Sequence, residues 1–224
     1  MVRERNEDSI LTDPTGALWA VADGMGGYGN GDVASEIVID CLAQIPDGVD
    51  PGPALVARLK EANDLVLLRQ RGAGMGRMGA TVVALLISGA VAHVAWAGDS
   101  RAYLLRGGRL RPLTRDHSVV QEMIDRGELS PEEAERHPES HVITRAVGGS
   151  MELEVDEISL PLAVGDRLLL CSDGLTRCVY EQTVEALLRE AKTPEDACQK
   201  LVREALENGA PDNVSAIAVH IREA

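Results

Sequence analysis

Phenylalanine is absent from this chain of 224 residues, and aromatic residues together make up only 2%. The interior must therefore be built from Leu, Val, Ala and Ile, because hydrophobic residues still amount to 45%. Basic charge is also scarce: 36 acidic residues outweigh 22 Lys and Arg and leave a net charge of −14. This balance argues against nucleic acid and anionic membranes as partners, since both attract basic surfaces.

Motifs for disulfides, structural zinc and membrane insertion are missing as well. No Cys-x-x-Cys pair occurs among the four cysteines, Cys41, Cys171, Cys178 and Cys198. The N-terminal segment has no apolar signal region, and no apolar run approaches membrane-spanning length. We therefore expect reduced, buried thiols and a cytoplasmic location. Because no Ser/Pro-rich linker divides the chain, residues 1–224 are expected to form one domain.

Hydrophobic periodicity predicts strands and helices in separate groups along the chain. A hairpin is expected over 10–22, and helices over 32–44, 54–71, 181–190 and 194–207. Further strands are expected over 81–87, 91–97, 102–105, 109–113, 153–160, 167–172 and 213–222. The four runs between 81 and 113 are separated by short turns, which predict antiparallel pairing of consecutive strands. Residues 114–147 are polar and helix-forming, with Ser130 as a helix cap before Pro131. The pattern indicates an α+β fold.

Short carboxylates recur where apolar strands begin or end. Asp23 follows the apolar run 19–22 and precedes glycines, which let the backbone approach whatever the carboxylate holds. The same arrangement recurs at Asp99, Asp173 and Asp212, and Asp8 stands before another apolar patch. Carboxylates that converge at one edge of a sheet repel each other unless hard cations neutralise them. The recurrence therefore predicts a Mg²⁺ or Mn²⁺ cluster built from aspartates.

Two other motifs suggest different sites but lack the required context. Residues 24–29 fit the G-x-G-x-x-G pattern of a dinucleotide site, yet Asp23 beside the first glycine would repel a pyrophosphate. The following helix also leads into a Pro/Gly-rich segment instead of a second parallel strand. His137 and His141 have the spacing of a zinc pair on a helix, but Pro138 disfavours a helical His137. A solvated loop is the better interpretation of this pair.

Taken together, the motifs resemble the metal-dependent Ser/Thr protein phosphatases, the PPM or type 2C family, in its compact bacterial form. Seven motifs occur in the family's order across nearly the whole chain: Arg3–Asp8, Val21–Gly27, Met78–Thr81, Gly98–Arg101, Leu113–Ser118, Ser172–Thr176 and Asp212–Ser215. The resemblance implies a four-layer α-β-β-α sandwich, in which two antiparallel sheets are flanked by helices. It also implies a flap at about 115–148.

The same resemblance implies the ligands and the reaction. Two Mn²⁺ or Mg²⁺ ions would lie between Asp8, Asp23, the Gly24 carbonyl, Asp173 and Asp212, with Asp23 bridging, and a third ion near Asp99 and Asp173. Arg3 aligns with the arginine that grips the substrate phosphate. A hydroxide bridging the ions would attack phosphorus in phosphoserine or phosphothreonine.

The resemblance leaves two questions open. Met25 stands where eukaryotic relatives carry a histidine, so the proton donor is unassigned, with metal-bound water and His117 as candidates. The partners implied are phosphorylated proteins and an opposing Ser/Thr kinase in a bacterial signalling pathway, with the chain acting as a monomer. Rival interpretations are a phosphatase dedicated to one small regulatory phosphoprotein and a catalytically silent module that binds a partner. The intact set of mutually repelling carboxylates argues against the silent module.

Overall fold

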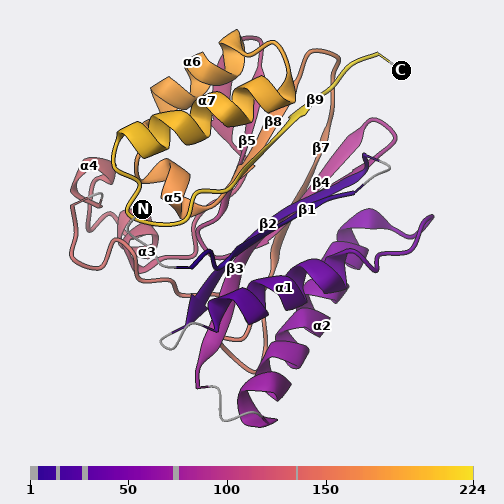
Figure 1. Cartoon of the computed structure of the whole chain (residues 1–224), viewed down its shortest axis with the longest axis vertical. Helices are drawn as coiled ribbons and strands as arrows, with labels where there is room; N and C mark the ends of the chain where they lie inside the picture. Colours follow the sequence, from indigo (N-terminus) through magenta and orange to yellow (C-terminus); the bar gives the residue numbers. More distant parts are fainter. Residues whose placement is uncertain (1–4, 14–15, 27–29, 73–75, 135, 224) are drawn as a thin grey trace.

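The computed structural model describes residues 5–13, 16–26, 30–72, 76–134 and 136–223. Two antiparallel sheets form its centre (Figure 1). The first sheet has the order β1-β2-β3-β4-β7, with β1 Asp8–Thr12, β2 Leu18–Gly26, β3 Met78–Ser88, β4 Val91–Ala97 and β7 Asp156–Pro161. The second has the order β6-β5-β8-β9, with β5 Arg101–Arg106, β6 Arg109–Pro112, β8 Arg167–Cys171 and β9 Ala216–His220.

Helices cover the outer face of each sheet. The first sheet carries α1 Gly31–Leu42 and α2 Pro51–Gly72, and the second carries α6 Glu181–Glu190 and α7 Pro194–Glu207 (Figure 1). Shorter helices are α3 Val119–Asp125, α4 Pro131–Ala134 and α5 Asp173–Thr176. The layers therefore follow the order α-β-β-α, and the predicted four-layer sandwich is confirmed.

Alternation along the strands produces three apolar layers from small aliphatic side chains. In β3, Val82 and Ala84 pack towards α1 and α2, whereas Val83 and Leu85 pack between the two sheets. This is the two-residue period of a strand that is buried on both faces. A third cluster, which includes Leu169, fills the space between the second sheet and α6 and α7. Aliphatic residues form most of these layers, with Trp96 in the second and Tyr103 in the third, and the packing needs no phenylalanine.

The predicted pairing of consecutive strands is wrong at one point. β4 and β5 do not pair; they belong to different sheets, and residues 98–100 connect them. Gly98 has a φ of 119°, and a Cβ there would lie 2.4 Å from the Cβ of Thr81, so the crossing requires glycine. The following residue, Asp99, is 6% exposed and lies where the chain passes from one sheet to the other.

Many boundaries agree with the periodicity, but α2, β3, β7 and β9 begin three residues away from their predicted starts. β4, α6 and α7 match their predicted ranges within one residue. β2 continues past Asp23 to Gly26, so this aspartate lies inside the strand and not at its end. Helix α5 was not predicted. Among the described residues of 115–148, where a flap was predicted, helix is confined to the short α3 and α4. The predicted Ser130 cap is confirmed, because its Oγ accepts from Glu133 N.

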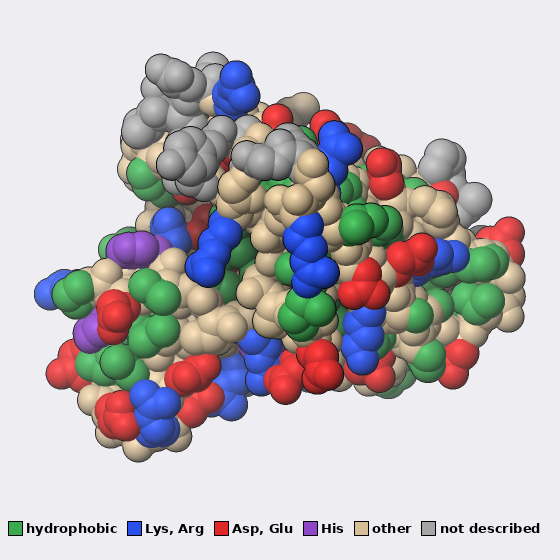
Figure 2. Space-filling model, turned by 90° about the horizontal axis from the view of Figure 1, so that it is seen from below, with side chains coloured by type: hydrophobic (Ala, Val, Ile, Leu, Met, Phe, Trp, Pro, Cys, Tyr) green, Lys and Arg blue, Asp and Glu red, His purple; other side chains and the backbone are tan. Residues whose placement is uncertain are grey.

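Charges of both signs mix on the surface. On the face shown in Figure 2, Lys and Arg side chains are interspersed with Asp and Glu and do not gather into one basic field. None of the helices that the structure describes combines the length and the apolar character needed to cross a membrane. The cysteines are free thiols, and burial raises the pKa of Cys171 to about 12, which agrees with its predicted place in the core.

Candidate metal centre

Pairing of β1 with β2 brings the first two predicted aspartates together. The Cα of Asp8 lies opposite that of Asp23 in the antiparallel ladder. On its other side, Asp23 lies opposite Thr81 of β3, so it occupies an inner strand of the sheet. Gly24, whose carbonyl was predicted as a ligand, follows Asp23 in β2, and its N–H donates to the Glu7 carbonyl at 3.1 Å.

Hydroxyl groups from the second sheet hold the Asp8 carboxylate. Ser215 Oγ donates to Asp8 Oδ2 at 2.7 Å, and Ser172 Oγ donates to the same oxygen at 3.0 Å. The Ser172 N–H donates to the Ser215 carbonyl at 3.1 Å, which extends the pairing of β8 with β9. Asn213 Oδ1 accepts from Glu7 N at 3.0 Å and adds a second link between the sheets. The ends of β1, β8 and β9 are therefore joined at the site.

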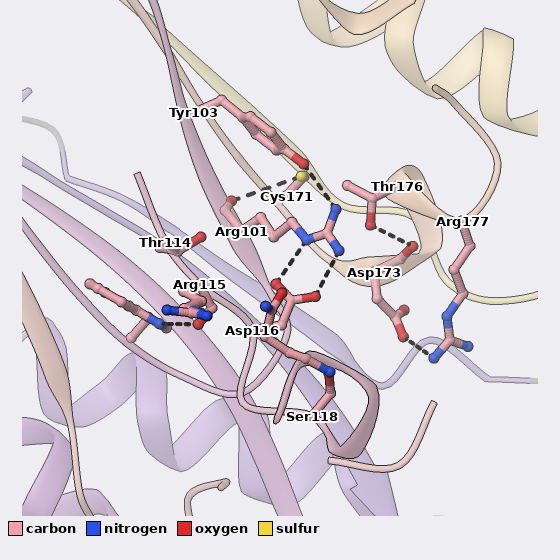
Figure 3. A network of polar contacts seen from close by, with 12 residues as sticks. Arg101, Tyr103, Thr114, Arg115, Asp116, Ser118, Cys171, Asp173, Thr176 and Arg177 are labelled. Carbon is pink, nitrogen blue, oxygen red and sulfur yellow. Dashed lines mark hydrogen bonds and ion pairs between the residues drawn. The ribbon is translucent and has the colours of Figure 1, made fainter. Parts of the chain in front are cut away.

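Helix α5 places Asp173 beside the loop that carries Asp212. Asp173 is the first residue of α5 and directly follows the Ser172 N-cap. A Cβ on Gly174 would lie 1.8 Å from the Asn213 carbonyl oxygen, so glycine is required for the close approach of these two segments. Arg177, one turn later, forms an ion pair with Asp173 Oδ2 at 2.5 Å, which Figure 3 shows.

The raised pKa values of the buried aspartates show that the charges of the five carboxylates act on one another. The pKa of Asp23 is raised to about 10, first by burial and then by the charges of Asp8, Asp173, Asp99 and Asp212, in that order of size. The pKa of Asp99 rises to about 7, chiefly through burial and then through Asp173. Burial likewise raises the pKa of Asp8 and of Asp173. The described segments thus bring the predicted aspartates Asp8, Asp23, Asp99, Asp173 and Asp212 into one electrostatic cluster.

The donor set fits a hard divalent cation. Asp99 Oδ1 and Asp173 Oδ1 are buried and lack a hydrogen-bond partner among the described residues. Buried carboxylate oxygens normally have a partner, and oxygen-only donors suit Mg²⁺ and Mn²⁺. Within the same described residues, no three His, Cys, Asp or Glu side chains are arranged to hold an ion by themselves. Mg²⁺ keeps several waters and needs only one or two carboxylates, so a sparse protein shell suits it.

The predicted phosphate-binding residue, Arg3, lies outside the described residues. A second basic group near the cluster is Arg101 of β5, which was not predicted to have a role. Its guanidinium donates to both carboxylate oxygens of Asp116, at 2.8 and 2.7 Å, and to Tyr103 Oη at 3.2 Å (Figure 3). The pair connects the second sheet to the start of the flap.

His117, a candidate proton donor, makes contacts that anchor the flap. Its Nδ1 accepts from Gly98 N at 3.2 Å, and its ring stacks on Trp96 with centroids 6.2 Å apart. Its Nε2 lies 3.4 Å from Asp156 Oδ2 and 3.4 Å from Arg145 Nη1. Burial lowers the pKa of His117. These contacts support a positioning role, and the identity of the proton donor stays a prediction.

A cavity of about 520 Å³ opens between Met25 of β2 and residues in the range 141–154. Met25, two residues after Asp23, contributes to its wall, together with flap and post-flap residues that include Thr144, Arg145, Glu152 and Glu154. None of the five aspartates lines it. Met25 is thus the link between the cavity and β2, the strand that carries Asp23.

Comparisons with known proteins agree with this geometry. The family profile described as Protein phosphatase 2C matches residues 3–123. The chain is 38% identical to the Serine/threonine protein phosphatase PstP of Mycobacterium tuberculosis over 99% of its own length but spans only 43% of that relative. It is 35% identical to the Serine/threonine phosphatase stp of Listeria monocytogenes, covering 97% of this chain and 91% of that one. The catalytic domain of PstP, solved in complex with two manganese ions, superposes with a TM-score of 0.91 at 36% identity, covering 100% of this chain and 94% of that one.

Proposed function

The chain belongs to the protein phosphatase 2C family, and from that premise we propose that it hydrolyses phosphoserine and phosphothreonine esters in proteins. The observation that carries the proposal is the cluster of five aspartates, in which burial and like charge raise the pKa of Asp23 to about 10. Carboxylates that repel one another so strongly reduce the stability of the fold unless cations neutralise them. The cluster therefore supports a metal-dependent hydrolase.

We propose the following ligand set for the cations. Asp8, Asp23, the Gly24 carbonyl, Asp173 and Asp212 would hold two Mn²⁺ or Mg²⁺ ions, with Asp23 shared, and Asp99 and Asp173 would hold a third. When bound, these cations would supply an acidified water and stabilise the negative charge that develops on the phosphoryl group. The solved relative with two manganese ions supports this choice of cation.

The neighbouring side chains would keep the ligands ionised and oriented. Ser172 and Ser215 hold one oxygen of Asp8, and their hydrogen bonds favour its charged form. The Asp8 oxygen that does not accept these bonds is thereby turned in a fixed direction. Arg3, which lies outside the described residues, is proposed to grip two phosphate oxygens of the substrate. The cavity beside Met25 is proposed to receive the protein segment around the phosphorylated residue.

The proposed partners and location follow from the same site. Phosphoproteins would be the substrates, and a Ser/Thr kinase would be needed to regenerate them. All five carboxylates come from one chain, so a monomer is sufficient for activity. The four free thiols are typical of a reducing compartment, which favours the bacterial cytoplasm. We also propose that residues 1–224 form a single phosphatase domain with the flap at 115–148.

The test is hydrolysis of p-nitrophenyl phosphate and of a phosphoserine peptide with Mn²⁺, with and without EDTA. Turnover should require Mn²⁺ and disappear in EDTA. Asp173→Asn should reduce kcat by about a thousandfold, because it removes a charged ligand. Asp64→Asn, on the exposed side of α2, is the matched control and should keep the normal rate. A folded wild-type protein without Mn²⁺-dependent turnover would instead support a binding module.

A further inference from the structure

Arg177 is a charged residue next to the carboxylate cluster to which the proposed reaction gives no role. It follows the last residue of α5, and its Nη2 lies 2.5 Å from Asp173 Oδ2 (Figure 3). The arginine side chain is 37% exposed, whereas the aspartate side chain is 12% exposed. The guanidinium therefore reaches a buried carboxylate from the solvent side and has room to move.

Arg177 forms its ion pair with Asp173, whose carboxylate belongs to the same cluster as that of Asp99. These two aspartates carry the buried oxygens, Asp99 Oδ1 and Asp173 Oδ1, that have no hydrogen-bond partner among the described residues. Arg177 holds the other oxygen of Asp173, so the unpartnered oxygen remains available to a cation.

Arg101, a second arginine near the cluster, pairs with a carboxylate outside it. Both carboxylate oxygens of Asp116 bind the guanidinium of Arg101. Its positive charge is therefore largely offset within the same contact. Arg177, by contrast, has Asp173 as its ion-pair partner in the described structure. Among the described residues, it is the positive charge that competes most directly for the carboxylates of this site.

We propose that Arg177 is a built-in counter-charge of the acidic cluster, which stabilises the cluster when cations are absent and weakens binding of the cation shared by Asp99 and Asp173. This inference rests on the proposed function. A guanidinium and a divalent cation on one carboxylate repel each other, and each attracts part of the same negative charge. Arg177 would thus make the site shared by Asp99 and Asp173 the weakest of the three, and it would set the concentration of free Mn²⁺ or Mg²⁺ at which this site fills.

A purely orienting role for Arg177 predicts the opposite result. Groups that hold a ligand in position increase metal affinity, and their removal typically costs about 10- to 100-fold. A counter-charge decreases affinity, and its removal should tighten binding by roughly tenfold, the size expected for a partly exposed charge near a divalent ion. The direction of the change in affinity therefore distinguishes the two roles.

The experiment is a titration of the full chain with Mn²⁺ at pH 8, in which free Mn²⁺ is measured by electron paramagnetic resonance. Wild type is compared with Arg177→Gln, which removes the charge, and Arg177→Lys, which keeps it. Arg189→Gln is the matched control, because Arg189 forms an i,i+4 pair with Glu185 on α6, away from the aspartates. Arg177→Met provides a second neutral variant if the glutamine variant does not fold.

We expect the neutral variants to fill the weakest site at a Mn²⁺ concentration about tenfold lower than wild type, and the Lys and Arg189 variants to stay within about twofold. In EDTA the neutral variants should melt below wild type, and saturating Mn²⁺ should remove the difference. Unchanged or weaker Mn²⁺ binding by the neutral variants would overturn the inference while leaving the phosphatase proposal intact. A wild-type protein that binds no Mn²⁺ would overturn both.

Discussion

Replacing Asp23 by Asn should stabilise the protein in the absence of metal while abolishing its proposed activity. Asp23 has a pKa of about 10 in the folded state, against 3.8 as the ordinary value, because it is buried among four other carboxylates. For a carboxyl group whose folded pKa is raised, the folded state binds more protons than the unfolded state. The free energy of unfolding therefore falls as pH rises from about 4 to about 10.

The size of the expected stabilisation follows from the difference between the folded and the ordinary pKa of Asp23. Each pKa unit corresponds to about 1.4 kcal/mol, so the penalty at pH 7 is at most about 4 kcal/mol. The neighbouring carboxylates share this penalty by taking up protons themselves, so we expect a gain of about 2–4 kcal/mol for Asp23→Asn. In a chain of this length such a gain raises Tm by roughly 4–15 °C.

The assay is thermal unfolding in EDTA at pH 5, 7 and 9, followed by circular dichroism. Asp23→Asn should melt above wild type at pH 7, and its Tm should fall less steeply with pH. Asp166→Asn is the control of opposite sign, because Asp166 accepts two hydrogen bonds from Arg106, at 2.8 and 2.6 Å, and its pKa is lowered. This variant should lose about 1–3 kcal/mol. If Asp23→Asn melts at or below wild type in EDTA, the account of mutual repulsion is wrong.

Three further predictions concern the groups around Asp23. Ser215→Ala removes the 2.7 Å hydrogen bond to Asp8 and should weaken Mn²⁺ binding by about 10- to 100-fold in a calorimetric titration; unchanged affinity would show that Asp8 needs no such support. Gly174→Ala places a Cβ 1.8 Å from the Asn213 carbonyl oxygen and should cost roughly 3 kcal/mol in urea unfolding, whereas a loss below about 0.5 kcal/mol would mean that the loop yields easily. Asp99 has a pKa of about 7, so below this pH the cation must displace a proton, and Mn²⁺ affinity at the weakest site should fall by about tenfold for each further pH unit. A pH-independent affinity between pH 5.5 and 7, measured by electron paramagnetic resonance, would contradict the role of Asp99.

Local sequence was sufficient for elements whose ends have their own chemical signals. Thr193 caps α7 through a 3.1 Å hydrogen bond from Asp196 N, and the range of this helix was predicted. The connection between β4 and β5 was not predicted correctly, because its length is the same whether a chain turns back in one sheet or crosses to another. The packing of two apolar sheet faces against each other decides between these two arrangements, and local turn signals carry no information about that packing.

The sequence predicted the carboxylates of the candidate site but not the side chains that hold them in place. The Asp-Gly and Asp-Asn dipeptides beside apolar strands marked Asp23, Asp173 and Asp212, and like charge predicted a cation between the carboxylates. The hydroxyls that hold Asp8 come from Ser172 and Ser215, which are 164 and 207 positions away in the chain, so no local pattern links them to it. Arg177 had a local signal in its four-residue spacing from Asp173, but the spacing has meaning only once α5 is known to be a helix.

The most direct measurement of the central claim is anomalous X-ray scattering from crystals grown with Mn²⁺. The account predicts two strong peaks between Asp8, Asp23, Asp173 and Asp212, and a weaker third peak beside Asp99. Peaks that lie elsewhere, or a protein that hydrolyses phosphoserine with no manganese at these carboxylates, would contradict it.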